Sequence, residues 1–155
     1  MQLGRRVALD VGKVRIGFAV SDPHSILVSP QQAEKRSDSS LATLAERIRE
    51  LADVVAVYVG LPVNLKSLET ESTRDSVAFA ADLKQLLDVD VRLVDERFST
   101  KIASQKLASV GKNSKQQRNL IDSEAASVIL ESAIEFEKRT GEFAGISVSE
   151  YRLED

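Results

Sequence analysis

Three acidic positions interrupt otherwise apolar patterns and are the first candidates for chemistry. Asp10 ends an apolar segment directly before a glycine-containing turn, and the consecutive acids Asp95 and Glu96 end a second apolar segment. Asp122 falls on the apolar stripe of a helical pattern, in line with apolar residues three and four positions apart. A buried carboxylate requires a cation or several hydrogen-bond donors, so Asp122 predicts a partner, either an Arg or a metal ion.

Carboxylates that converge from two strand ends and one helix would repel one another and raise their own pKa values unless divalent cations neutralise them. Ligands that offer only oxygen select Mg²⁺ or Mn²⁺. Two such ions about 3.5–4 Å apart can activate a water molecule and stabilise the leaving oxygen in phosphodiester cleavage. Each acid also has a purely structural interpretation. Asp10 can stabilise the turn that follows it, and Asp122 can form a salt bridge in the core. Asp95 and Glu96 can simply end a strand, and because neighbouring side chains point to opposite faces, only one of the two can face a shared site.

The composition narrows the chemistry further. The chain has 155 residues, 43% hydrophobic and 29% charged, which is typical of one compact domain. It contains no Cys, which excludes disulfides, thiolate metal sites and cysteine nucleophiles. His24 is its only His, so a zinc site built on several imidazoles cannot form. Any metal must therefore be held by carboxylates.

The charge is unevenly distributed along the chain. The formal net charge is −3, which alone argues weakly against a nucleic-acid partner. Residues 97–121 contain six Lys or Arg and no Asp or Glu, so this segment carries +6 and the rest of the chain −9. Such a segment predicts either a solvated helix face with its loop or a surface for phosphates.

The elements that must position these residues follow from the apolar periodicity. Alternation predicts an antiparallel meander of three strands, a continuous apolar run predicts each of two buried strands, and spacings of three and four predict helices. A polar loop is expected at about 60–72, and the helix after residue 99 is expected to be capped by Ser99 and ended by Gly111. The expected strands are 6–10, 15–21, about 25–29, 54–59 and 89–94, and the expected helices are 40–51, one that includes 79–87, 99–110 and about 119–138.

This order predicts an α/β fold whose mixed central sheet has about five strands, three in an antiparallel meander and two parallel, flanked by helices. Residues 1–139 are expected to form a single domain, and residues 140–155 a loosely held or disordered tail. The longest apolar run, Val54–Val63, has ten residues against the ~20 that a membrane helix needs. No signal-peptide core follows the N-terminus, so a cytoplasmic location without membrane association is expected.

Four stretches of the chain form a recognisable set of motifs: Leu9–Gly17 with Val20–Asp22, Val59–Pro62, Asp95–Thr100, and Ile121–Ser123 with Ala125 and Ala126. With these motifs the chain resembles the YqgF family of RNase H-like, RuvC-related proteins. The resemblance covers about residues 7–136. The resemblance implies an RNase H-like fold and a nuclease that uses Mg²⁺ or Mn²⁺.

The resemblance also implies roles for individual residues. Asp10, Glu96 and Asp122 would be the catalytic, metal-binding acids, with Asp95 as the alternative to Glu96. A second group would contact the phosphates of a nucleic acid, through side-chain charges, hydroxyls or a helix start. Its members are Lys13, Arg15, Arg97, Ser99, Thr100, Lys112, Lys115 and Arg118.

Two classes of function fit these residues. The first is a metal-dependent endonuclease on structured nucleic acid, with maturation of the 5′ end of pre-16S rRNA in ribosome biogenesis expected ahead of resolution of four-way DNA junctions. The second is a non-catalytic module of the same fold that binds RNA, or ribosome-assembly or transcription proteins. Three convergent acids exceed what binding requires, which favours the nuclease. A monomer suits trimming of one RNA end, and a homodimer suits a two-fold symmetric junction.

Overall fold

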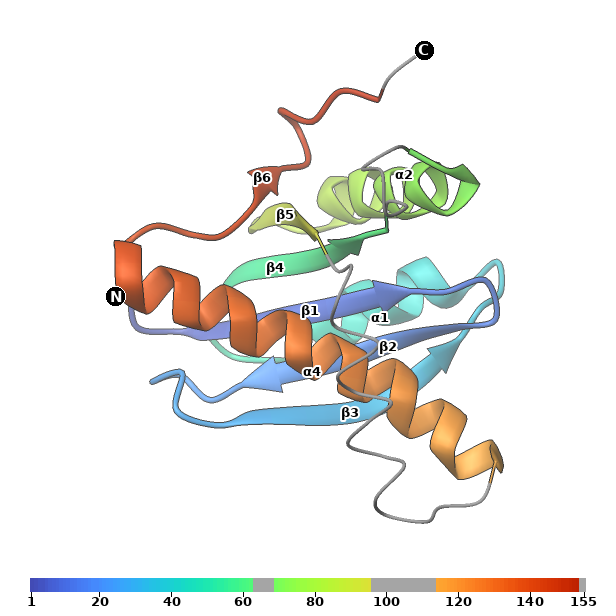
Figure 1. The fold of residues 1–155 in the computed structure, drawn as a ribbon, viewed down its shortest axis with the longest axis horizontal. Helices are drawn as coiled ribbons and strands as arrows, with labels where there is room; N and C mark the ends of the chain where they lie inside the picture. The colour runs from blue at the N-terminus through green and yellow to red at the C-terminus, as the bar shows by residue number, and fades with distance from the viewer. Residues whose placement is uncertain (63–68, 96–113, 154–155) are drawn as a thin grey trace.

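The structure is a computed structural model that describes residues 1–62, 69–95 and 114–153, with residues 114–122 described by their backbone. Three consecutive strands come first, and helices and strands alternate after them (Figure 1). The strands are β1 (Arg5–Val11), β2 (Arg15–Ser21), β3 (Val28–Lys35), β4 (Val54–Leu61), β5 (Asp90–Asp95) and β6 (Ile146–Ser147), and the helices are α1 (Ser40–Arg49), α2 (Glu71–Leu86) and α4 (Ser114–Thr140).

All of these strands form one mixed sheet in the order β3-β2-β1-β4-β5-β6. The first three pair antiparallel as the expected meander, and β1, β4 and β5 are parallel neighbours. The α/β class and the mixed sheet are therefore confirmed. The sheet has six strands where about five were expected, because β6 adds an antiparallel edge beside β5.

The sheet is covered on both faces, and strand alternation divides its side chains between two cores. Odd-numbered residues of β1, such as Val7 and Leu9, pack with Leu44 of α1 and Leu83 of α2. Even-numbered Ala8 packs on the opposite face with apolar residues of α4. Figure 1 shows α4 crossing the front of β1, β2 and β3 while α1 lies behind the sheet. None of the described helices is long and apolar enough to cross a membrane.

Strand β3 begins and ends later than the expected residues 25–29. The carboxylate of Asp22 accepts hydrogen bonds from the backbone N–H groups of His24, Ile26 and Leu27, which closes these residues into a loop instead of a strand. The strand then runs past Pro30 to Lys35. Because β3 is the outer strand of the sheet, a residue without an N–H donor is tolerated there.

The helix starts differ in how they are capped. Thr70 and Thr73 form a reciprocal capping box at the start of α2, and the Thr73 hydroxyl also donates to the carbonyl of Pro62. At α1 the N-cap residue, Ser39, makes no side-chain cap bond, and its hydroxyl forms a hydrogen bond with the hydroxyl of Ser37 instead. Helix α4 includes the expected 119–138 and begins earlier, at Ser114. The helix expected at 99–110 lies outside the described residues.

The C-terminal segment differs from the expected loose tail over the described residues 141–153. Arg92 of β5 donates to the carbonyls of Ala144 and Gly145 at 2.7 and 2.8 Å, and Val148 is buried. The hydroxyl of Tyr151 donates to Glu69 at 2.5 Å. The segment is held because β5 would otherwise leave an open edge, and its partners are too distant in sequence for composition to reveal them.

Gly145 is the residue on which this docking depends. Its φ is +72°, and an added Cβ would collide with the carbonyl oxygen of Leu93. We expect Gly145→Ala to lower the free energy of unfolding by roughly 2–4 kcal/mol, because a steric conflict of ~1–3 kcal/mol adds to the left-handed backbone penalty. Gly141→Ala is the matched control, since Gly141 has φ +80° and open space around its Cβ, and it should cost about 1 kcal/mol. Equal losses in urea unfolding would contradict the docking role.

Candidate functional site

The carboxyl ends of the parallel strands define one edge of the sheet, where ligands bind in open α/β folds. The register pairs Leu9 with Val59, and Leu61 with Asp95. Asp10 follows Leu9 at this edge, is half-buried, and pairs across β1 and β2 with Gly17. Asp10 is therefore placed where the sequence predicts it, at the end of a buried strand.

Asp10 and Asp95 lie near the ends of two strands of the sheet. Asp10 lies two residues beyond Ala8, so it is on the α4 face. On β5, Val94 packs against the α4-side core, whereas Asp95 is exposed and lies one residue further, at odd parity. Asp95 nevertheless lines a cavity together with Ile129 and Ala133 of α4, so strand parity does not assign it to the face opposite Asp10. Glu96 lies outside the described residues.

A tight turn after Val11 joins β1 to β2. The N–H of Gly12 donates to the carbonyl of Arg15 at 2.9 Å, and a Cβ on Gly12 would lie 2.7 Å from that same oxygen. Lys13 is exposed in this turn, and Arg15 is half-buried at the start of β2, opposite Lys35. Both cations predicted to contact phosphates in this region therefore flank the edge that carries Asp10.

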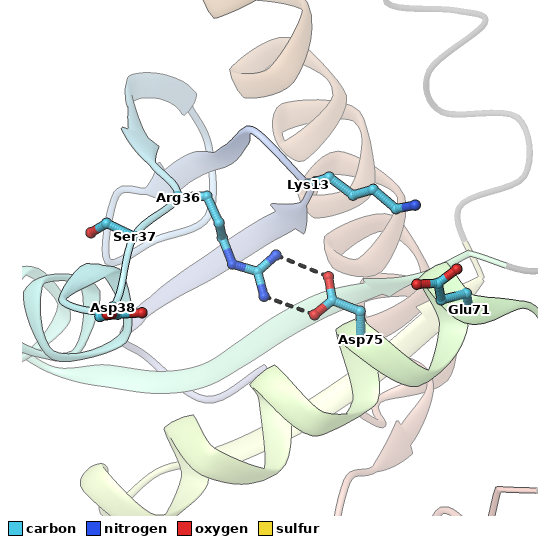
Figure 2. A pocket seen from close by; sticks show the side chains of 6 residues that line it. All are labelled: Lys13, Arg36, Ser37, Asp38, Glu71 and Asp75. Carbon is cyan, nitrogen blue, oxygen red and sulfur yellow. Dashed lines mark hydrogen bonds and ion pairs between the residues drawn. The ribbon is translucent and has the colours of Figure 1, made fainter.

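A cavity of about 520 Å³ lies beside the turn, between it and the start of α2. Its lining is Lys13, Arg36, Ser37, Asp38, Glu71 and Asp75. Figure 2 shows the guanidinium of Arg36 directed at the carboxylate of Asp75, and the two form a bidentate pair at 2.8 and 2.9 Å. Sequence reasoning missed Arg36 and Asp75, because no local pattern links residues that are 39 positions apart.

This pair sets the electrostatics of the cavity. The hydrogen bond from Arg36 holds the pKa of Asp75 below its ordinary value, with a smaller contribution from the positive charge of Lys13. The same hydrogen bond raises the pKa of Arg36. Asp75 is therefore a carboxylate throughout the physiological range, and it faces two cations.

We expect Arg36→Gln to raise the pKa of Asp75 toward 3.8, its ordinary value, because the main stabiliser of the carboxylate is removed. In the wild type, the contribution of this pair to stability is fully present above that ordinary value and is lost as the pH falls through the lower folded pKa. A titration of the Asp75 carboxyl carbon by NMR measures the change. Arg47→Gln, which removes a cation from another ion pair, should leave the titration of Asp75 unmoved; an unchanged Asp75 in Arg36→Gln would contradict the assignment.

The remaining predicted site residues are only partly within the described part of the chain. Lys115, Arg118 and Asp122 belong to α4, and their side chains are not described. Arg97, Ser99, Thr100 and Lys112 lie outside the described residues, as Glu96 does. Within the described part, no three His, Asp or Glu side chains gather as a metal site. Asp10 and Asp95 are described carboxylates at this edge, and carboxylate oxygens are the donors that Mg²⁺ and Mn²⁺ prefer.

Proteins of known family match this chain over most of its length. A family model described as "RuvX: Holliday junction resolvase" matches residues 4–136. A relative from Mycobacteroides abscessus is 44% identical over 142 residues, covering 89% of this chain and 85% of its own, and one from Clavibacter sepedonicus is 40% identical over 157 residues, covering 99% and 97%. Both are named "Putative pre-16S rRNA nuclease".

Solved structures support the fold class. The structure described as "T. thermophilus RuvC in complex with Holliday junction substrate" is 14% identical, with a TM-score of 0.56, and covers 90% of this chain and 98% of its own. At that identity the likeness concerns the fold alone, and it confirms the expected RNase H-like architecture. The family match over 4–136 agrees with the resemblance found in the sequence motifs, and it shows that the chain belongs to the RuvX family.

Proposed function

We propose that this protein is a Mg²⁺- or Mn²⁺-dependent endonuclease that cuts phosphodiester bonds in structured nucleic acid. The observation that carries the proposal is Asp10, a half-buried carboxylate at the carboxyl edge of a central parallel strand, followed after Val11 by a turn that presents Lys13. A carboxylate in such a place can hold a divalent cation, and the neighbouring cation can hold a phosphate.

Asp10, Glu96 and Asp122 are the proposed metal ligands. Asp95, at the end of β5, is the alternative to Glu96. Asp122 belongs to α4, one turn before Ala126, which packs in the same core as Ala8. When bound, the ions would supply an activated water and stabilise the leaving oxygen of the cleaved bond.

The basic residues are proposed to hold the nucleic acid by its phosphates. Lys13 and Arg15 flank the edge that carries Asp10, and residues 97–121 carry a further charge of +6. The proposed contacts are Lys13, Arg15, Arg97, Ser99, Thr100, Lys112, Lys115 and Arg118. Because such contacts release counterions, we expect the affinity to fall steeply with salt.

The 5′ end of pre-16S rRNA is the first proposed substrate, supported by the name that the relatives share at 40–44% identity over most of both chains. The second is a four-way DNA junction, supported by the family description. We place the activity in the cytoplasm, alone or with ribosome-assembly or transcription proteins, as a monomer on RNA or a homodimer on a junction.

Cleavage of labelled substrates tests the proposal. The full chain is incubated with a precursor 16S rRNA leader or a synthetic four-way junction, each with Mn²⁺, Mg²⁺ or EDTA. Metal-dependent cutting is the expected result, and the preferred substrate assigns the class. Salt-sensitive binding without cutting of either substrate would overturn the nuclease and favour a binding module of the same fold.

A further inference from the structure

Arg36 connects three parts of the molecule that surround the candidate site. It lies directly after β3, and its guanidinium reaches both the turn between β1 and β2 and helix α2 (Figure 2). The same guanidinium lies over the ring of the buried Phe79, 5.4 Å from the ring centroid. An arginine with this many fixed partners, one-quarter exposed, has little freedom left to reach solvent phosphates.

The contacts of Arg36 with the turn are made on both sides of Lys13. Its side-chain Nη1 donates to the carbonyl of Gly12 at 2.9 Å. Its backbone N–H donates to the carbonyl of Val14 at 2.8 Å. One residue thus fixes the peptide groups before and after Lys13, and Gly12 itself is only two residues beyond Asp10.

Asp75 fixes the guanidinium in turn. Two parallel hydrogen bonds between a guanidinium and a carboxylate constrain direction as well as distance, which a single ammonium cannot do. Because Asp75 is on α2, whose Leu83 and Phe79 pack into the core, the pair ties the turn to a rigid element. The chain of contacts therefore runs from the helix through Asp75 and Arg36 to the backbone of the turn.

We infer that Arg36, held by Asp75, is a positioning residue that sets the place of Asp10 and Lys13 at the edge of the sheet. The inference rests on the proposed function, since it assigns Arg36 to the same site. A displacement of about 1 Å at a reacting group can cost on the order of 10²-fold in rate. Arg36 does not touch the substrate; it acts through the turn.

The test compares Arg36→Gln with Arg47→Gln. Arg47 is a close match: it pairs with Glu34, donates to the carbonyl of Gln32 at 3.0 Å, and lies over the ring of Phe18 at 4.5 Å, but it does not contact the turn. We expect Arg36→Gln to lower kcat for metal-dependent cleavage by about 10–100-fold, the usual cost of losing a supporting partner of a metal site. Arg47→Gln should stay within about twofold of the wild type.

Arg36→Lys and Asp75→Asn refine the comparison. A lysine keeps the charge but can donate to only one of the two acceptors, the Gly12 carbonyl or the Asp75 carboxylate, at a time. Arg36→Lys should therefore have a kcat between those of Arg36→Gln and the wild type. Asp75→Asn keeps the volume but weakens the bidentate pair, so it should lower kcat in the same direction and less than Arg36→Gln does. Full activity in both Arg36 variants would overturn the inference.

Amide hydrogen exchange supplies a readout that does not require cleavage. The backbone N–H of Gly12 donates a hydrogen bond to the carbonyl of Arg15, and the backbone N–H of residue 36 donates one to the carbonyl of Val14. We expect both to exchange at least about tenfold faster in Arg36→Gln, and at the wild-type rate in Arg47→Gln. If the wild type cuts and the exchange is unchanged in Arg36→Gln, the positioning role alone fails. If the wild type cuts neither substrate while the exchange rises, the proposed function fails and the Arg36 contact with the turn stands.

Discussion

We expect the rate of metal-dependent cleavage to fall by more than about a hundredfold in Asp10→Asn, because the substitution removes a metal ligand. Loss of a residue that supports a metal ligand lowers activity or metal affinity by ~10–100-fold. Loss of the ligand itself should lower the activity further. Asn has nearly the shape of Asp but carries no charge, so it withdraws the negative charge that holds a divalent cation at the edge of the sheet. Initial rates with saturating Mn²⁺ and Mg²⁺ measure the loss.

A control and a second measurement separate this loss from misfolding. Asp88→Asn removes an exposed carboxylate from the link between α2 and β5, at the end of β5 opposite Asp95, and should leave cleavage unchanged. Mn²⁺ should raise the Tm of the wild type, because it binds only the folded state, and raise that of Asp10→Asn far less. If Asp10→Asn cuts as fast as the wild type, Asp10 is not a metal ligand. If neither the wild type nor Asp10→Asn cuts and both bind RNA equally well, the result favours the binding module.

The strands and the edge residue could be predicted because their signals are local. An apolar segment that ends at Asp10 or Asp95 predicts both a strand and the position of its carboxyl end. Alternation along the strand predicts which face of the sheet each side chain lies on. Asp10 lies near the carboxyl end of β1, as the apolar segment predicts, although the strand runs one residue beyond the expected end, to Val11. The start of α2 was not predicted: the helix begins at Glu71, within the polar loop expected at about 60–72, because Thr70 and Thr73 form a capping box there.

Features that depend on distant partners could not be predicted. The C-terminal segment looked unfolded by composition, yet Arg92 and Gly145 join it to β5 across more than 50 residues. Strand β3 was misplaced because the hydrogen bonds of Asp22 to Leu27 compete with strand formation, and alternation does not register them. Arg36 and Asp75 have no local pattern that distinguishes them from other charged residues, and only the fold brings them into contact.

The largest effect on stability is expected at a pair that the sequence also conceals. Arg6 of β1 is fully buried and forms a bidentate pair with Glu137 of α4 at 2.7 and 2.9 Å. Its remaining N–H groups are donated to the carbonyls of Gly4 and Gln2 and to the hydroxyl of Ser25. Every donor of the guanidinium therefore has an acceptor, which is the condition under which a buried charge is tolerated.

We expect Glu137→Gln to lower the free energy of unfolding by about 3–5 kcal/mol, because it leaves the guanidinium of Arg6 buried without a counter-charge. The double variant Arg6→Met with Glu137→Leu should recover most of that loss, since it removes both charges and keeps apolar volume in the core. Glu46→Gln is the control: Glu46 pairs with Arg49 on the surface of α1 with 62% of its side chain exposed, so its loss should stay within about 0.5 kcal/mol. Urea unfolding of the four proteins measures these differences. A loss in Glu137→Gln as small as in Glu46→Gln would mean that water reaches Arg6, because only solvent could replace the carboxylate at so small a cost.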